Sequence, residues 1–431
     1  MLKVYKTNLL DYIKKISSKG DEPEWMLETR IKSLEFFENS VMPSMRYGSN
    51  IHLKLDLDFE KFEFENKLLD DENSDGNNRN SKDNDKNKKD NIEIKTYGKA
   101  IVKSLNENLQ ETTVEFPEIR ESFMKTALPD NKILAMHSAF WNSGNFIKIP
   151  KRSKATIIIN TKVKSNSSIN HIILIAEPLS EVNIIEMVNS CEGSSEFMER
   201  EAIRSGVLEI HAKEGAQVKY YSLQNLERNT YSFGIKKAII ERDAKVDFLS
   251  CCLGGKFSML DTVEILREQG ASSDDSCLFF GNKDQQFEIS SSTIHAAPNT
   301  KSNMLVKGAL DDRARTVYQG LIKINNNASN SDGYQKQDTL MLSQEAEMNP
   351  IPTLEIDNNE VKCSHGASVG QLDKEKLFYL MSRGITEKDA KNVLVQAFFE
   401  EIIGKIDQVD IQEFTNAFAD EVREIISSKL R

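Results

Sequence analysis

Residues 155–372 alternate short runs of β-branched and other apolar side chains with turn-forming Gly, Asn, Asp and Ser residues. Few stretches of this region have the spacing of a long amphipathic helix. Similar segments begin at Glu214, Arg242 and Gln269, which are 28 and 27 residues apart, and each places an alanine after a polar turn residue. This even spacing suits either a β-sandwich or a stack of repeated rungs.

The connections between these runs favour the stack of rungs. Asn-Gly and Asp-Gly turns, which join antiparallel hairpins, are scarce, and Asp332-Gly333 is an exception. Small residues stand instead at the ends of brief strand-like segments. We therefore predict a mainly β protein whose core, residues 131–372, is a parallel β-helix. The strand-like segments include TKSNMLVKGAL, ARTVYQGLIKI, DTLMLS and PTLEI.

Helical periodicity appears near the N-terminus. Between Asp21 and Val41, Pro23 follows an acidic residue at the start of the pattern, and Met42-Pro43 is expected to end it. We predict an amphipathic helix here, within an N-terminal helical segment of residues 1–46. The apolar positions at helical spacing are Leu27, Ile31, Leu34 and Phe37.

A second helical region begins after residue 372. Asp373 can cap a helix that Gly384 ends, and Thr386 can cap another that Gly404 ends. A third helix is expected over Val409–Leu430. Residues 373–431 are therefore predicted to form a C-terminal helical domain, whose apolar faces must meet the β body, one another or a partner. The apolar face of the second helix is predicted to hold Ala390, Val393, Leu394 and Ala397.

Residues 47–130 are expected to form a mixed α/β region. Ile51–Phe64 alternates apolar and polar positions, which predicts a strand. Asp70–Asn91 contains no aliphatic or aromatic side chain, so it cannot offset the entropy of ordering, and we predict a disordered insertion. Asn131–Pro150 is interpreted as a loop followed by a strand.

Composition and charge narrow the class of protein. The 431 residues are 39% hydrophobic, which is enough to fill two or three cores. No apolar run approaches the roughly 20 residues that cross a bilayer, and the N-terminus lacks a signal-like apolar stretch, so we expect no membrane partner. A net charge of -11 argues against nucleic acid as a partner. Five cysteines without framework spacing predict reduced thiols and a cytoplasmic protein.

Common enzyme motifs are missing from the sequence. Neither GxxxxGK[ST] nor GxGxxG occurs, and the nucleophile elbow GxSxG is also absent. A β-helix enzyme that acts on carbohydrates needs clustered carboxylates, and no such acidic motif stands out. This enzyme class remains an alternative, as does a stand-alone metal or thiol enzyme that uses Cys363.

The chemistry-bearing residues gather near one position. Cys363 and His365 are one residue apart, so on a strand they share a face, where a thiolate and an imidazole could bind iron or a borderline metal. Two ligands do not complete a site, because a closed tetrahedral site needs four and the chain has no CxxC. The missing ligands would come from elsewhere in the fold or from another subunit. Burial of both side chains for structural reasons is the other interpretation.

Other conspicuous residues favour structural roles. His137 has no second ligand nearby in the sequence, so we expect a hydrogen-bonded histidine near a core rather than a metal ligand. The adjacent Cys251 and Cys252 would face opposite sides of a strand, which favours core packing of one or both.

Several long motifs resemble the SufB/SufD family of iron–sulfur cluster assembly proteins. They are STIHAAPNTKSNMLVKGALDD, VYQGLIKI, LEIDNNEVKCSHGASVGQLD and LFYLMSRGI, all within residues 292–385. EPEWMLETRIKSLEFF with the later Met-Pro resembles the family's N-terminal helix, and EGAQVKYYSLQNL resembles its central segment. The resemblance covers nearly the whole chain apart from Asp70–Asn91.

This resemblance implies a right-handed parallel β-helix core with helical terminal domains. It also implies that the chain is a scaffold subunit and not an enzyme, and that a partner, the ABC-type ATPase SufC, supplies ATP hydrolysis. The C-terminal helical domain, residues 373–431, would bind SufC, and a nascent iron–sulfur cluster would be shared with a SufB-like partner. The residues expected to bind the ATPase partner are Phe378, Tyr379, Arg383 and Phe398.

The CSHGA form is most similar to SufD. SufB carries a cysteine at the position of Ala346 and a glutamate at the position of Gly366, and both are missing here. The resemblance therefore implies that His365 takes part in building the cluster across a SufB–SufD interface, and Cys363 matches the family's cysteine beside it. A SufB-type homodimer is the alternative assembly. Flavin has been suggested for the family's complex, but no feature of this sequence supports it.

Overall fold

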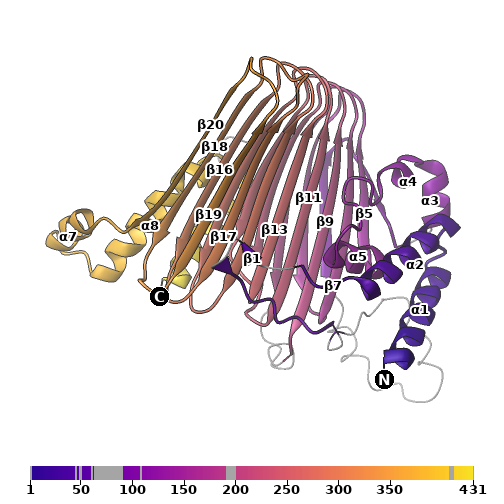
Figure 1. Cartoon of the computed structure of the whole chain (residues 1–431), viewed down its shortest axis with the longest axis horizontal. Helices are drawn as coiled ribbons and strands as arrows, with labels where there is room; N and C mark the ends of the chain where they lie inside the picture. Colours follow the sequence, from indigo (N-terminus) through magenta and orange to yellow (C-terminus); the bar gives the residue numbers. More distant parts are fainter. Residues whose placement is uncertain are drawn as a thin grey trace.

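A computed structural model describes residues 2–43, 46–47, 51–59, 62, 91–106, 109–190, 200–406 and 412–430. Its body is a parallel β-helix built from two nine-stranded sheets (Figure 1). Because the chain crosses between the sheets at each rung, neighbours within a sheet are two strands apart in sequence. This architecture confirms the predicted mainly β fold, with helices at both ends of the chain.

The first sheet has, in order from one edge, β20 (Lys362–Gln371), β18 (Asp332–Met341), β16 (Lys301–Leu310), β14 (Ser272–Gly281), β12 (Lys245–Cys252), β10 (Gln217–Asn225), β8 (Glu181–Ser190), β6 (Lys154–Val163) and β3 (Asn91–Gly98). The second has β19 (Glu347–Ile356), β17 (Arg315–Ile324), β15 (Gln286–His295), β13 (Phe257–Leu266), β11 (Thr230–Ile240), β9 (Ala202–Ala212), β7 (Ser167–Ala176), β5 (Ser143–Ile149) and β4 (Ile101–Ser104). Neighbours are parallel except that β3 pairs with β6, and β4 with β5, in antiparallel register.

The repeat expected from the sequence lies at the turns between the sheets. Ala216, Ala244 and Ala271 follow these turns, and all three are fully buried. The N–H of Lys245 donates to the carbonyl of Ala216 at 2.8 Å, and the N–H of Ser272 donates to that of Ala244 at 3.0 Å. Small side chains are needed at this corner because successive rungs stack directly upon one another.

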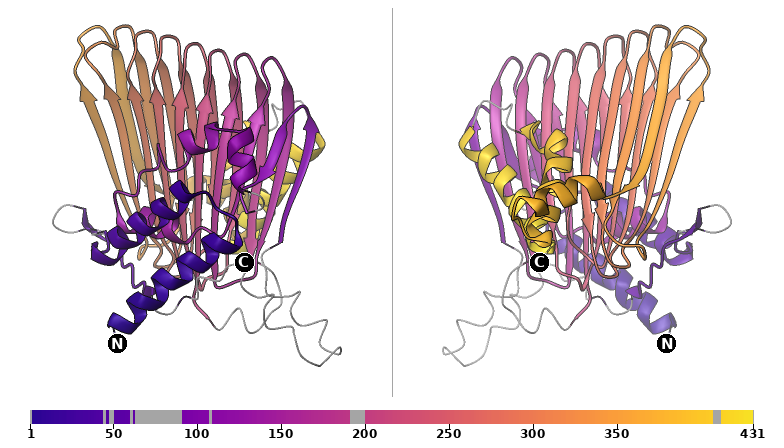
Figure 2. Two further views of the ribbon diagram at one scale, coloured as in Figure 1. Left: turned by 90° about the vertical axis from the view of Figure 1, so that its right-hand side faces the viewer. Right: turned by 90° about the vertical axis from the view of Figure 1, so that its left-hand side faces the viewer.

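The N-terminal helices cover the side of the β-helix near its first rungs (Figures 1 and 2). Arg30 links two of these helices, because its buried guanidinium donates to the carbonyl of Ala139 at 2.9 Å. The same guanidinium donates to the Glu22 carboxylate at 2.7 Å. The helix expected after Asp21 is confirmed by α2. The elements are α1 (Leu2–Lys19), α2 (Glu24–Asn39), the short β1 (Arg46–Tyr47) and β2 (Ile51–His52), α3 (Leu109–Glu115), α4 (Glu118–Ser122) and α5 (Lys132–Phe140).

The strand predicted for Ile51–Phe64 is wrong for most of its length. Among the described residues of this segment only Ile51–His52 is strand, and residues 53–58 are assigned to no helix or strand. The side-chain amide of Gln286 bonds both backbone groups of Lys54 in place of a neighbouring strand, at 2.6 and 3.0 Å. The apolar alternation arises because one side of this segment, including Leu53, packs against the N-terminal core.

Two further predictions concern neighbouring segments, and one of them is wrong. The loop predicted after Asn131 is the helix α5, because the Asn131 side chain accepts hydrogen bonds from the N–H groups of Ile133 and Leu134, both at 3.0 Å. Of the insertion predicted for Asp70–Asn91, residues 70–90 lie outside the described residues, and Asn91 begins β3.

Three helices follow the last strand: α7 (Lys374–Ser382), α8 (Glu387–Ile403) and α9 (Gln412–Lys429). Asp373 and Thr386 accept hydrogen bonds from backbone N–H groups at the starts of α7 and α8, as their capping roles predict. Figure 2 shows α8 and α9 against the outer face of the sheet that contains β8 to β18. None of the described helices is both long and apolar enough to cross a membrane.

The buried face of α8 includes Ala390, as predicted, but otherwise differs from the predicted face. Val393 and Ala397 are exposed, whereas Val395 and Phe399 are buried. The helix lies on the apolar outer surface of the sheet, so contact with that surface selects the buried face. The sheet residues in this cluster include Tyr221, Leu223, Leu249, Leu278, Phe280 and Leu305.

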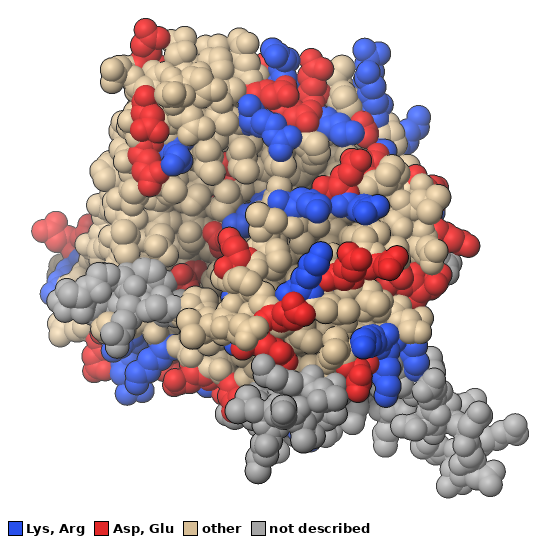
Figure 3. All heavy atoms as spheres, turned by 45° about the vertical axis from the view of Figure 1, so that its right-hand side comes forward, with Lys and Arg blue, Asp and Glu red and all other residues tan. Residues whose placement is uncertain are grey.

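Charged side chains of both signs are interspersed on the side of the molecule shown in Figure 3. One network extends across successive turns, because the Lys148 ammonium contacts Glu118 at 2.5 Å and Glu177 at 3.4 Å, while Lys213 contacts Glu177 at 2.8 Å. Networks of this kind contribute more to stability than isolated surface ion pairs.

Candidate functional site

Both ends of the β-helix have strands with a single described strand partner, and the ends differ in the direction of that pairing and in the helices beside them. At one end, β3 and β4 extend the two sheets beyond β6 and β5 in antiparallel register. The N-terminal helices lie beside β5 and β9 at this end (Figure 1). At the other end, β20 pairs only with β18 and β19 only with β17 among the described strands. Edge strands of this kind carry backbone groups that can pair with another chain. We call the β19–β20 rung the open end.

Cys363 and His365 lie on β20 at the open end. Their backbone partners on β18 are Gly333 and Gln335, which are buried inside the β-helix, whereas Tyr334 between them is exposed. Because side chains alternate along a strand, Cys363 and His365 continue the interior row. The structure thus places both side chains on one face, as their spacing predicts.

The two side chains differ in exposure and chemistry. Cys363 is half-buried and packs beside Ile322 and Leu354, whereas His365 is exposed because no further rung covers it. Burial raises the pKa of the Cys363 thiol, and the Asp332 carboxylate raises it further. The thiol therefore stays protonated at neutral pH until a metal or a cationic group displaces the proton.

A polar pair lies one rung behind His365. The Gln335 amide and the Tyr318 hydroxyl are buried, and neither has a hydrogen-bond partner among the described residues. Gly320 makes their approach possible, because a Cβ at this position would overlap the Gln335 oxygen and lie 2.6 Å from the Tyr318 hydroxyl. Sequence reasoning missed these residues, although polar Gln335 and Gln337 at inward positions of β18 were a usable signal.

The two positions that depart from the SufB pattern have different surroundings. Gly366 follows His365 and has nothing within 4 Å of the place where a Cβ would stand. Ala346 lies in the bend just before β19 and is buried beside Met341 and Met348. The structure groups no three His, Cys, Asp or Glu side chains that could hold a metal within the described ranges. As a pair, Cys363 and His365 are too few side chains for a closed metal site.

The expected partner-binding residues separate into two places. Phe378 and Tyr379 of α7 are 72% and 58% exposed, and the Arg383 guanidinium lies 5.2 Å from the Tyr379 ring centre. Together with exposed Met381 they form what we call the α7 surface. Phe398 lies on α8, where the Lys307 ammonium is 4.7 Å from its ring centre, so it contacts the β body instead.

The remaining sequence candidates have structural roles. His137 is fully buried and hydrogen-bonded to Ser205, as predicted. Cys251 and Cys252 are buried on opposite sides of β12, which confirms the core-packing prediction. Cys252 faces the interior beside Cys277, and a hydrogen bond between the two thiols lowers the pKa of Cys252 and raises that of Cys277. Cys191 lies outside the described residues.

The fold and the open end together define a β-helix subunit with an uncovered terminal rung. Residues 157–398 match the family model described as "SUF system FeS cluster assembly, SufBD core domain". A SufBD family protein of Staphylococcus saprophyticus is 27% identical over 90% of this chain and 87% of its own length. The iron–sulfur cluster assembly protein SufB of Bacillus subtilis is 26% identical over 90% of this chain and 88% of its own length.

The family match spans more than half of the chain and includes most of the β-helix. The chain belongs to the SufBD family of iron–sulfur cluster assembly proteins. This membership favours a role in assembly over the carbohydrate-active alternative.

Proposed function

We propose that this chain is a SufD-like, non-catalytic subunit of an iron–sulfur cluster assembly scaffold. It pairs with a SufB-like protein through the open end and binds a SufC-like ABC ATPase through the α7 surface. The observation that carries the proposal is the incomplete ligand set of Cys363 and His365 on the uncovered terminal strand. A half-site at an open edge is suited to completion by another subunit.

Pairing at the open end uses the backbone of β19 and β20. An added strand from the partner would satisfy the unpaired edge groups by β-augmentation. Apolar side chains at or near this end, Ile356 and Val369, are exposed and would be covered in the same step. His365 then faces the partner, and its imidazole is a suitable ligand for incoming iron.

The nascent cluster is the cargo of this site. His365 contributes one nitrogen ligand, and the half-buried Cys363 supplies a thiol that becomes a ligand only after deprotonation. SufB-like residues supply what this chain lacks, namely the cysteine and the glutamate at the positions of Ala346 and Gly366. Transfer of the cluster requires that the interface can open, and a site shared between two subunits would allow this.

The α7 surface is the proposed contact with the ATPase. Exposed Phe378 and Tyr379 fit a helix-in-groove contact, in which an apolar helix face enters a groove of the partner. Movement of α7 would reach the β-helix through α8, because Lys307 on β16 donates to the carbonyl of Phe398 at 3.0 Å and pairs with Glu401 at 2.5 Å. ATP hydrolysis in the partner can thus act on the β-helix through the contacts between α8 and β16.

Assembly of this chain with its two proposed partners tests the proposal. The chain is co-expressed with a SufB-like protein and a SufC-like ATPase, and the purified complex is weighed by native mass spectrometry. We expect a complex with one copy of this chain and one SufB-like subunit, each bound to ATPase. A stable homodimer that ignores the SufB-like protein would support the SufB-type alternative, and a monomer that binds neither protein would overturn the proposal.

A further inference from the structure

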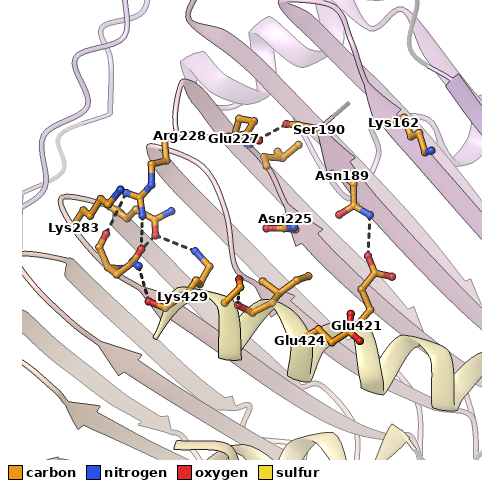
Figure 4. A pocket seen from close by; sticks show the side chains of 15 residues that line it. Lys162, Asn189, Ser190, Asn225, Glu227, Arg228, Lys283, Glu421, Glu424 and Lys429 are labelled. Atoms are coloured by element: carbon orange, nitrogen blue, oxygen red, sulfur yellow. Dashed lines mark hydrogen bonds between the residues drawn. The ribbon is translucent and has the colours of Figure 1, made fainter. Parts of the chain in front are cut away.

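A cavity of about 850 Å³ lies between α9 and the ends of β8, β10 and β14 (Figure 4). This volume falls within the range of small-molecule sites. The cavity lies on the α9 side of the sheet, and it includes no residue of the open end or of the α7 surface. Neither of the two proposed contacts uses it.

Three basic side chains converge on one side of this cavity. Arg228 comes from the turn after β10, Lys283 from the turn after β14 and Lys429 from the last turn of α9. Figure 4 shows them beside one another, with Lys162 on the opposite side and Glu421 and Glu424 farther along α9. Side chains from three separate segments meet here, so the tertiary fold creates the basic cluster.

The positive charge of Lys429 is not neutralised by a carboxylate among the described residues. Its ammonium donates a hydrogen bond to the neutral amide oxygen of Gln285 at 3.3 Å, and no ion pair of Lys429 occurs among the described residues. Burial, together with the charges of Arg228 and Lys283, lowers its pKa to about 8, and the Glu227 carboxylate acts in the opposite direction. An anion between these three cations would relieve their repulsion.

The neighbouring cation is also only weakly neutralised. Arg228 donates to the carbonyl and side-chain oxygens of Asn282, which fixes the guanidinium toward the cavity. Its carboxylate neighbour, Asp284, lies 3.9 Å away and is 81% exposed on its side chain. A guanidinium held in this way presents its remaining N–H groups in the fork that phosphate oxygens accept.

We propose that this cavity binds a small phosphorylated molecule, with the phosphate group held among Arg228, Lys283 and Lys429. Amide and hydroxyl groups of Asn189, Asn225 and Ser190 line the rest of the cavity and suit hydroxyl-bearing parts of such a ligand. The ligand would connect α9 to two turns of the β-helix. Its binding would therefore favour the docked position of the C-terminal helices.

The test uses calorimetric titration of the full-length protein with inorganic phosphate, pyrophosphate and a nucleoside monophosphate. At about pH 8, near the pKa of Lys429, a bound phosphate should draw a proton onto the amine. The apparent binding enthalpy should then depend on the ionisation heat of the buffer. Tighter binding of the nucleoside monophosphate would indicate an organic ligand, and equal binding of phosphate would indicate recognition of the phosphate group alone.

Matched variants separate the site from general electrostatics. Lys429→Met and Arg228→Gln should each weaken binding by about tenfold or more, whereas Lys162→Met, on the opposite side of the cavity, should change it by less than about twofold. Lys429→Met should also abolish the proton uptake. Absence of saturable binding for all three probes, or equal weakening by Lys162→Met, would overturn the proposal. Melting temperatures without ligand show whether each variant is folded.

Discussion

His137 Nε2 and His171 Nδ1 lie 3.1 Å apart and join the N-terminal helices to the β-helix. His137 belongs to α5, and its Nδ1 contacts the Ser205 hydroxyl on β9 at 2.9 Å. His171 belongs to β7, and its Nε2 lies 3.2 Å from a carboxylate oxygen of Glu209. All of these side chains are buried, so the chain of contacts acts as a structural connection.

Glu209 is predicted to be a main stabilising residue of this connection. Its carboxylate accepts hydrogen bonds from the N–H groups of Thr126 at 2.7 Å and Lys125 at 3.1 Å. Burial disfavours its ionisation, but the close contact with His171 and the hydrogen bonds from Thr126 outweigh burial and lower its pKa. Glu209→Ala leaves several buried donors unpaired, so it should reduce the free energy of unfolding by about 3 kcal/mol or more.

Urea unfolding followed by circular dichroism measures this loss. The control is Glu241→Ala, which removes a more exposed partner of His211, 2.6 Å away, and should cost less than about 1 kcal/mol. Equal costs for the two variants would contradict the structural importance of Glu209.

The pH dependence of stability should include a contribution from His295. Its ring nitrogens contact the hydroxyls of Thr300 and Ser302, both at 2.8 Å, and burial lowers its pKa to about 4. The unfolded chain, with a histidine pKa near 6.5, takes up the proton first as the pH falls. The stabilisation is therefore complete above about pH 6.5 and is lost as the pH falls toward about 4, by an amount on the order of 3 kcal/mol.

Unfolding titrations of wild type and His295→Gln at several pH values isolate this contribution. Glutamine can still bond a hydroxyl but does not titrate, so its stability curve should be flatter between about pH 6.5 and 4. His137, whose pKa is lowered by burial and by His171, titrates in the same direction in both proteins and cancels in the difference. Parallel curves would contradict the assignment to His295.

His365→Ala should lower the cluster yield of the reconstituted complex while leaving its subunit composition unchanged. The imidazole is exposed on the terminal strand, so its removal should not affect folding. Absorbance of the cluster and bound iron and sulfide measure the yield. Ser364→Ala, which changes the opposite face of β20, is the matched control. An undiminished yield in His365→Ala would rule out its role as a ligand.

Charge on the α7 surface should prevent capture of the ATPase. Phe378→Glu and Tyr379→Glu place carboxylates where an apolar contact is proposed, and each should weaken binding by at least about tenfold. Pull-down of the SufC-like protein measures the effect. Val114→Glu is the control, because this side chain is 80% exposed on α3, toward the opposite end of the molecule. Unchanged capture by both α7 variants would place the ATPase elsewhere.

Restoring the SufB-type residues should increase the metal affinity of this chain. Gly366 has open space for a glutamate side chain, and Ala346 lies in the bend before β19. The double variant Ala346→Cys with Gly366→Glu should bind ferrous iron more tightly than wild type under anaerobic titration. His365→Ala in that background should reverse the gain. No gain in the double variant would indicate that the positions do not converge with His365.

The local features of this protein follow from its amino-acid sequence. The turn repeat after Glu214, Arg242 and Gln269 predicts the rungs, because each rung buries its own short apolar runs in the same way. Asp373 and Thr386 predict helix starts because a cap depends only on the next few residues. The shared face of Cys363 and His365 follows in the same way from the two-residue period of a strand.

Contacts between residues that are far apart in the chain depend on the tertiary fold. The sheet surface selected the buried face of α8, and the Gln286 amide replaced a strand partner for Lys54 across 232 residues. His137 reaches its histidine partner across 34 residues, so no local period could reveal it. The end of the rung stack left His365 exposed, because exposure there depends on whether another rung follows and not on the residue's own neighbours.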